Sequence, residues 1–348
     1  MATPTYQPAI MSASLGRAWA HDLAHKIACA SAAGFKGIEI FYEDLEYHAR
    51  SLGNLPQTAS PSDDALLTAA SDIHTLCTTH NLTILGLQPF LFYEGLKDRT
   101  QHAKLITKMN LWLRLAHALH TNTIQIPANF LPASELITDD NMDTLVADLQ
   151  QIADLGAAQN PPIRFAYENL CWSTLVDTPA KLWNVVSRVD RPNFGMCLDT
   201  FNIAGRIWAD PAAESGKTEN ADAELKEALE RMVAEIDVAK VFYIQVVDAE
   251  RMETPLVPGH EFYVEGQPAR MSWSRNARTF MYEVDRGAYL PVEEVARAII
   301  HGLGYEGFVS MELFSRTMAE EGEHVSGEHA ARGIRAWETF AERLQLNQ

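Results

Sequence analysis

The sequence predicts an α/β protein, a single (β/α)8 TIM barrel domain of residues 1–348 with long loops after the sixth and seventh strands. Short apolar runs alternate along the chain with longer amphipathic segments, a pattern typical of a parallel sheet with crossover helices. There are eight of each, which favours a closed barrel, with a doubly wound open sheet as the alternative. The length of 348 residues allows one barrel with insertions or two smaller domains.

Each predicted strand is a short, mainly apolar run. The predicted strands are Ala9–Ser14, Gly37–Tyr42, Thr83–Gln88, Thr123–Pro127, Ile163–Glu168, Phe194–Asp199, Val241–Val246 and Gly307–Leu313. Helical patterns, with apolar residues three or four apart, lie at about 20–33, 62–80, 97–120, 139–159, 177–189, 221–239, 291–303 and 326–346. Gly34 and Gly304 each stand just before a strand and are expected to end the preceding helices.

Two connections are longer than a barrel requires. Residues 200–220 follow the sixth predicted strand, and residues 247–290 follow the seventh. Loops of this length are usually functional or disordered. The second contains several aromatic and arginine residues, so we expect an extended but ordered lid at 247–290. Both connections follow the carboxyl ends of strands, which is the face of a barrel that carries active sites.

Composition and charge restrict the partners. The net charge of −18 argues against nucleic acid, whose binding depends on Lys and Arg. No apolar run is long enough to cross a membrane, and no signal peptide is evident, so we expect a cytoplasmic protein. The four cysteines are widely spaced and are expected to be reduced. The sequence makes no prediction of oligomeric state.

Four polar residues interrupt the ends of four consecutive predicted strands. They are Glu168, Asp199, Gln245 and Glu312. Strands five to eight are neighbours around half a barrel, so these side chains can converge on one point. Burying three carboxylates together is costly unless a cation offsets their charge. An all-oxygen set of this kind suits Mg²⁺ or Mn²⁺ better than structural Zn²⁺.

Other polar residues share the same end of the barrel. Glu39 and Glu43 alternate along the second predicted strand, so both are expected to point inward. Gln88 closes the third strand and Gln125 lies in the fourth. Of the twelve histidines, His260 is singled out because it lies on the expected lid.

The order Glu, Asp, Gln, Glu on strands five to eight resembles the xylose isomerase-like superfamily of sugar isomerases, epimerases and their relatives. More narrowly, the chain resembles the fungal 3-dehydroshikimate dehydratases of quinate catabolism. The resembling stretches extend over essentially the whole chain and are Gly37–Asp44, Leu87–Phe90 with Tyr93–Gly95, Ile124–Pro127, Ala166–Asn169, Cys197–Gly205 and Met271–Arg278. The last of these is the most specific.

The resemblance implies a lyase that converts 3-dehydroshikimate to protocatechuate with one divalent metal ion. Mg²⁺ or Mn²⁺ is expected, with Co²⁺ and Zn²⁺ as alternatives. It also implies that the metal ligands are Glu168, Asp199, Gln245 and Glu312. Many superfamily members have His three residues after the strand-six Asp, whereas this chain has Asn202, which leaves the catalytic base open.

The chemistry of such a substrate, a cyclic hydroxy-keto acid, assigns further roles. Removal of the proton between ketone and hydroxyl gives an enediolate that a divalent cation stabilises, and loss of the β-hydroxyl as water leads to an aromatic ring. His260 and Glu43 are the candidates for acid and base. Arg275 or Arg278 is expected to clamp the carboxylate. Gln88 and Trp273 are expected to contact the substrate.

Three other functions stay open at this stage. A sugar isomerase or epimerase would use the same metal but needs a pocket for several hydroxyls, whereas the arginines favour an acid substrate. An apurinic endonuclease would share the barrel, but the net charge opposes it. A non-catalytic binding barrel would not need three buried carboxylates.

Overall fold

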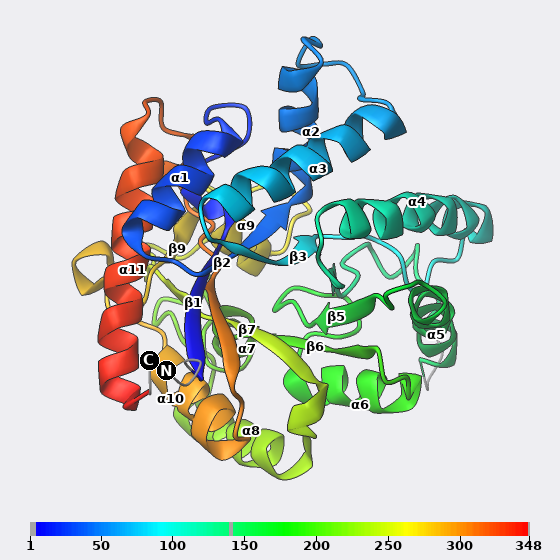
Figure 1. Cartoon of the computed structure of the whole chain (residues 1–348). Coiled ribbons are helices and arrows are strands. Elements are labelled where there is room, and N and C mark those ends of the chain that lie inside the picture. Colours follow the sequence, from blue (N-terminus) through cyan, green and yellow to red (C-terminus); the bar gives the residue numbers. More distant parts are fainter. Residues whose placement is uncertain (1–4, 139–141, 347–348) are drawn as a thin grey trace.

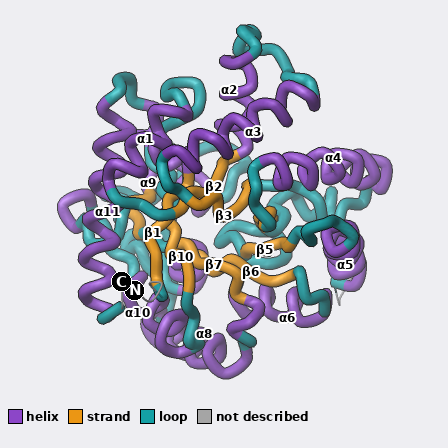
Figure 2. Tube along the Cα trace, viewed as in Figure 1, coloured by secondary structure: helices purple, strands orange, loops and turns teal. Residues whose placement is uncertain are grey.

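The eight apolar runs of the sequence form eight parallel strands that close into a barrel. The computed structural model describes residues 5–138 and 142–346. The strand order around the barrel is β1-β10-β7-β6-β5-β4-β3-β2, and Figure 2 shows these strands at the centre with helices around them. The strands are β1 Tyr6–Met11, β2 Gly37–Phe41, β3 Thr83–Gln88, β4 Thr123–Pro127, β5 Arg164–Glu168, β6 Phe194–Asp199, β7 Val241–Gln245 and β10 Gly307–Met311. The predicted single-domain (β/α)8 barrel is confirmed, and the open sheet is wrong.

Helices at all eight predicted places cover the barrel. They are α1 Leu23–Ala33, α3 Asp63–Thr79, α4 Arg99–Ala118, α5 Asp143–Ala157, α6 Pro179–Val189, α8 Ala221–Glu235, α10 Val292–Arg297 and α11 His324–Leu344. Residues 139–141 of the predicted fourth helix lie outside the described residues. Figure 1 shows α1 beside α11, as expected where the last strand closes onto the first. Asp22, Ser62, Asp98 and Thr178 cap four of these helices with side-chain oxygens, which satisfy free N–H groups of the first turn.

Three further helices lie outside the eight predicted places, and two of them begin directly after a strand. They are α2 Tyr42–Leu52, α7 Thr200–Ile207 and α9 Ala269–Ala277. Because α2 starts directly after β2, Glu43 lies on a helix and not, as expected, on the strand. α7 starts directly after Asp199 because that side chain accepts a hydrogen bond from Phe201 N at 2.8 Å. Part of the predicted loop 200–220 is therefore helical.

The first strand ends earlier than predicted. It stops at Met11, and residues Ser12–Leu15 form a 3₁₀ turn. Ser12 Oγ accepts a hydrogen bond from Phe41 N at 2.9 Å and donates to Asp44 Oδ2 at 2.6 Å. Side-chain hydrogen bonds of this kind compete with strand pairing, so the chain turns across the barrel mouth at this point.

Residues 247–290 form a folded segment with short elements of its own. β8 Asp248–Ala249 pairs antiparallel with β9 Arg278–Thr279, and α9 lies between them in sequence. The Asp248 carboxylate accepts hydrogen bonds from Ala249 N and Leu290 N at 2.7 and 2.8 Å, which ties the two ends of the segment together. Trp273 and Phe280 are fully buried. We call residues 247–290 the long insertion.

Two sequence expectations concern the whole chain. Cys29, Cys77, Cys171 and Cys197 are all free thiols, as predicted. Among the described residues, no helix combines the length and apolar character needed to cross a membrane.

Candidate active site

Three carboxylates from three barrel strands meet at the carboxyl end of the barrel. Glu168 ends β5, Asp199 ends β6, and Glu312 directly follows β10. One carboxylate oxygen of each lies within 4.8 Å of the others, and the three residues are 2%, 0% and 4% exposed. The structure thus brings together three of the four residues expected to be ligands, because the strand ends of a parallel barrel share one mouth.

Gln245, the fourth expected ligand, belongs to the same network. It ends β7 and is fully buried. Its Nε2 donates to Glu312 Oε1 at 2.9 Å and to Glu39 Oε2 at 3.1 Å, while its Oε1 accepts a weak hydrogen bond from the Cys197 thiol. A metal ion beside Glu312 would require the amide to turn its oxygen toward the ion. We call Glu168, Asp199, Gln245 and Glu312 the acidic floor.

Burial disfavours the ionised forms of the carboxylates on the acidic floor. Burial raises the pKa of Glu168 well above its usual range, and the carboxylates of Glu312 and Asp199 raise it further. Burial also raises the pKa of Glu312, to about 8, against the opposing effect of Arg278. These shifts have one physical cause, which is that several carboxylates lie together away from water.

The donor set fits a hard divalent cation. Carboxylate and amide oxygens are the ligands that Mg²⁺ and Mn²⁺ prefer. Among the residues that the structure describes, these three carboxylates form the only group of His, Cys, Asp or Glu side chains close enough to share an ion. Nearby, Gln125 Nε2 donates to Glu168 Oε2, and Gln125 Oε1 is buried without a hydrogen-bond partner in the described chain.

Arg278 is held by the acidic floor itself. Its Nη1 lies 3.0 Å from Asp199 Oδ2 and 2.9 Å from Glu312 Oε2, and the residue is 2% exposed. The guanidinium also packs over the Phe201 ring at 4.1 Å from the ring centroid. The sequence offered Arg278 as a clamp for a substrate carboxylate, but the structure pairs it with two protein carboxylates.

Asn202 links two carboxylates of the acidic floor. Its Nδ2 donates to Glu168 Oε1 at 2.9 Å and to Asp199 Oδ2 at 2.7 Å. Its Oδ1 accepts a hydrogen bond from Cys171 N at 3.0 Å. Both the Nδ2 donor and the Oδ1 acceptor of this amide therefore have partners, which fix its orientation. α7 places Asn202 here because the helix begins immediately after Asp199.

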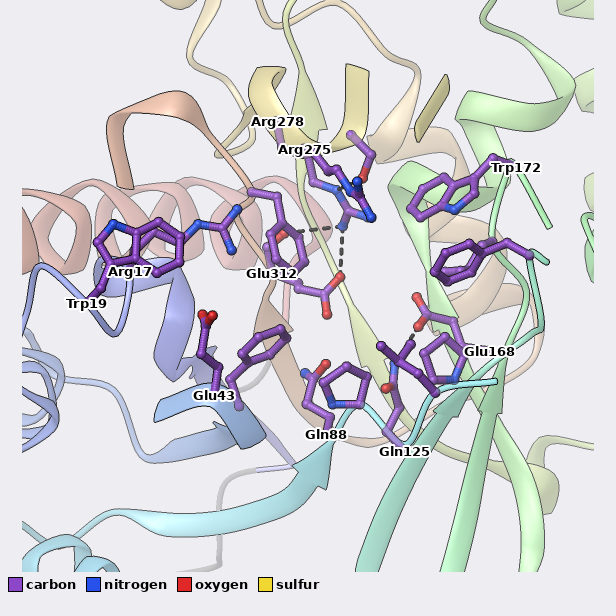
Figure 3. A pocket seen from close by; sticks show the side chains of 18 residues that line it. Arg17, Trp19, Glu43, Gln88, Gln125, Glu168, Trp172, Arg275, Arg278 and Glu312 are labelled. Atoms are coloured by element: carbon purple, nitrogen blue, oxygen red, sulfur yellow. Dashed lines mark hydrogen bonds and ion pairs between the residues drawn. The ribbon is translucent and has the colours of Figure 1, made fainter. Parts of the chain in front are cut away.

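A cavity of about 450 Å³ lies over the acidic floor. Glu168 and Glu312 line it together with Gln88 and Gln125. Figure 3 shows Arg17 and Glu43 on one side of this space and Trp172 on the other. Apolar side chains make up much of the rest of the lining, namely Trp19, Phe41, Pro89, Leu91, Pro127, Phe130, Leu170, Trp172 and Phe314. A cavity that combines apolar walls, charged side chains and a polar floor suits a small ring that carries an ionised group.

Three more expected site residues also line the cavity. Glu43 reaches it from the first turn of α2, and burial raises the pKa of its carboxyl group while Arg17 opposes that shift. Gln88 donates from Nε2 to Glu39 Oε2 at 2.7 Å. Arg275 extends from α9 and donates to Gln267 Oε1 at 2.9 Å. Glu39 points into the barrel as predicted and is 1% exposed.

Two expected site residues lie away from the cavity. Trp273 is fully buried, and its Nε1 donates to Glu250 O at 2.8 Å, so its ring supports the long insertion from inside. His260 sits in a local turn in which its N donates to Val257 O and its Nδ1 accepts from Phe262 N, each at 3.0 Å. Neither residue lines the cavity, so the structure does not bring them together with the other expected site residues, and their roles remain predictions.

Several residues that the structure places around the cavity were not predicted from the sequence. Arg17 follows the 3₁₀ turn after β1, and Phe130 and Trp172 lie in the connections after β4 and β5. The one usable signal was their position just after predicted strands.

The model of the family described as xylose isomerase-like TIM barrel matches residues 27–339. The chain belongs to this family. A Neurospora crassa protein named 3-dehydroshikimate dehydratase is 53% identical over 340 residues, which make up 97% of this chain and 94% of that protein.

Solved structures of the xylose isomerase-like fold agree with this assignment. A xylose isomerase-like TIM barrel/4-hydroxyphenylpyruvate dioxygenase fusion protein superposes with a TM-score of 0.68 at 22% identity, over 97% of this chain and 43% of that chain. The present chain thus spans less than half of the fusion protein. The IOLI protein with a bound zinc atom superposes with a TM-score of 0.65 at 16% identity, over 97% of this chain and 99% of that chain. At these identities the two structures support the fold alone.

Proposed function

We propose that this protein is a hydro-lyase that converts 3-dehydroshikimate to protocatechuate and water. The observation that carries the proposal is the 53% identity, over 97% of this chain, to the Neurospora crassa protein named 3-dehydroshikimate dehydratase. The cavity adds physical support, because it combines a polar floor, apolar side chains and arginines. The substrate is a small cyclic hydroxy-keto acid.

The proposal includes one divalent metal ion on the acidic floor. Glu168, Asp199, Gln245 and Glu312 would hold it, with Mg²⁺ or Mn²⁺ favoured by the all-oxygen donors and Co²⁺ or Zn²⁺ as alternatives. When bound, the ion supplies Lewis acidity that stabilises the negative charge developing as the substrate loses its α-proton. Asn202 keeps Glu168 and Asp199 in place through its two N–H donors.

The side chains of the cavity supply the remaining chemistry. Glu43 is our candidate base for the proton on the carbon between ketone and hydroxyl, because its carboxyl group lines the cavity and its raised pKa suits proton transfer. The β-hydroxyl then leaves with a proton as water, and loss of one more ring proton to the ketone oxygen completes the aromatic ring. Phe130 and Trp172 offer flat apolar surfaces to that ring.

The test is a turnover assay on 3-dehydroshikimate, followed by the ultraviolet absorbance of protocatechuate. We expect turnover that a chelator abolishes and that Mg²⁺ or Mn²⁺ restores, with Co²⁺ and Zn²⁺ compared in parallel. Absence of turnover with every ion would reject the dehydratase. Epimerisation of a free ketose in the same samples would instead support the sugar isomerase or epimerase alternative.

The cellular setting is part of the proposal. A dehydratase of this substrate belongs in quinate and shikimate catabolism, and we expect it in the cytoplasm. The four free thiols are compatible with that location.

A further inference from the structure

Two arginines that line the cavity have no carboxylate partner. They are Arg17 and Arg275, which we call the arginine pair. Within the described part of the chain, no Asp or Glu oxygen lies within the salt-bridge distance of 4.0 Å from either guanidinium. Arg278 in the same cavity has two such partners. The arginine pair therefore differs from Arg278 in keeping its charge and donors available.

The surroundings of the arginine pair leave most of its donors unused. The Arg17 guanidinium lies 5.5 Å from the centre of the Trp19 ring and 5.7 Å from that of Phe314. It makes no hydrogen bond to another described residue, and Arg275 makes one, to Gln267 Oε1. Partly buried cations with free donors are costly unless an anion joins them.

Burial disfavours the charged form of both arginines. Burial lowers the pKa of Arg275, and the positive charge of Arg17 lowers it further. Burial lowers the pKa of Arg17 as well, against Glu43 and Asp44. An anion bound between the two guanidinium groups would relieve both effects.

The position of Arg17 is fixed by its backbone. Arg17 N donates to Met318 O at 2.8 Å, and Arg17 O accepts from His21 N at 2.9 Å. The preceding Gly16 has φ +134°, and a Cβ at that position would lie 2.3 Å from the His21 side chain. The tight turn therefore fixes the point at which the Arg17 side chain leaves the backbone beside the cavity.

We propose that Arg17 and Arg275 together bind the carboxylate of the substrate, and that Arg17 makes the cavity specific for rings that carry an acid group. The inference rests on the proposed function, because it takes the substrate to be a hydroxy-keto acid. The carboxylate lies across the ring from the hydroxy-ketone edge, so a ring whose hydroxy-ketone faces the acidic floor turns its carboxylate away from that floor. The planar guanidinium forks match a carboxylate in two-point hydrogen bonding.

The test compares two ring ligands that differ only in the acid group. Dissociation constants of protocatechuate and catechol are measured by calorimetry on the metal-loaded full chain. We expect the wild type to bind protocatechuate at least about tenfold more tightly. Arg17→Gln and Arg275→Gln should each raise the dissociation constant of protocatechuate by about tenfold or more. The dissociation constant of catechol should change by less than about twofold. Arg17→Lys keeps the charge but loses the two-point hydrogen bonding of the guanidinium, so its dissociation constant for protocatechuate should lie between those of the wild type and Arg17→Gln.

Arg335→Gln is the matched control, because Arg335 is exposed on α11 and does not line the cavity. It should change neither constant. The proposal is overturned if the wild type does not bind protocatechuate more tightly than catechol. It is also overturned if Arg17→Gln weakens the binding of both ligands equally, or of neither ligand. A purely structural role for Arg17 predicts equal weakening.

The same variants separate this inference from the proposed function. If the wild type turns over 3-dehydroshikimate and Arg17→Gln keeps its KM, the carboxylate assignment fails and the dehydratase stands. If the wild type shows the ligand preference and its loss in Arg17→Gln but no turnover, the anion site stands and the dehydratase fails.

Discussion

The acidic floor and the arginine pair lie in one cavity but are built in different ways. On the acidic floor, every side chain has partners inside the protein, and Arg278 and Asn202 connect carboxylates to each other. In the arginine pair, neither guanidinium has a carboxylate partner within the described part of the chain, and most donors are free. We infer from this difference that the acidic floor suits a cation held within the fold, whereas the arginine pair suits an anion that comes from outside. Substitutions in the two sets should therefore have different effects.

The largest expected effect is on the acidic floor. Glu168→Gln and Glu312→Gln keep the shape and one oxygen but remove a negative charge, so we expect loss of bound metal and a fall in kcat/KM on the order of a thousandfold. The circular dichroism spectrum should not change. Glu94→Gln is the control, because Glu94 is also buried but lies outside the cavity lining. Full activity in either floor variant would defeat the ligand assignment.

The second effect concerns stability with and without metal. Arg278→Met leaves Asp199 and Glu312 without their cation, which should lower the free energy of unfolding of the metal-free protein by about 3 kcal/mol. Because a bound ion offsets the same charges, saturating Mn²⁺ should reduce the loss. Urea unfolding measures both values.

Arg332→Met provides the control for that comparison. Arg332 is paired with Glu283, at 2.6 and 2.8 Å, away from the acidic floor. Its loss of stability should be the same with and without Mn²⁺. Equal losses for Arg278→Met in the two conditions would contradict the link between Arg278 and the metal.

A smaller effect is expected at Asn202. Asn202→Ala removes two donors that orient Glu168 and Asp199, so the dissociation constant for Mn²⁺ should rise by about 10–100-fold. Asn276→Ala is the matched control, since Asn276 Nδ2 donates to Ser272 O within α9 and touches no floor residue. Titration calorimetry gives both constants. An unchanged constant in Asn202→Ala would show that the amide does not position the ligands.

The smallest effect is expected in the long insertion. His260→Gln should change kcat/KM by less than about twofold, because the imidazole is engaged in a local turn outside the cavity lining. Steady-state kinetics over several pH values test this. A large loss of kcat would mean that the long insertion moves His260 to the substrate.

The barrel and the acidic floor could be predicted because each depends on short stretches of sequence. The strand ends at Glu168 and Asp199 were located correctly, since a carboxylate in an apolar strand is a conspicuous local signal. The start of α7 was missed because its cap is Asp199 itself, which reads equally well as a strand end. The early end of β1 was missed because Ser12 bonds to Phe41 and Asp44 on another element.

The remainder of the site depends on where the side chains of loops point, which the sequence alone does not determine. His260 and Trp273 were favoured because they lie in the long insertion. In the fold of that segment, His260 lies in a local turn and Trp273 lies in the core. Arg17 carries no pattern of its own, and its position follows from the turn at Gly16 and the contact with Met318. Local patterns predict which residues stand at strand ends, whereas packing decides which loop side chains reach them.

Anomalous scattering from crystals grown with Mn²⁺ would show whether the acidic floor holds one divalent cation. We expect a single strong peak among the carboxylates of Glu168, Asp199 and Glu312, with the Gln245 amide oxygen turned toward it. No peak at the acidic floor, with Arg278 still bridging Asp199 and Glu312 in saturating Mn²⁺, would contradict it.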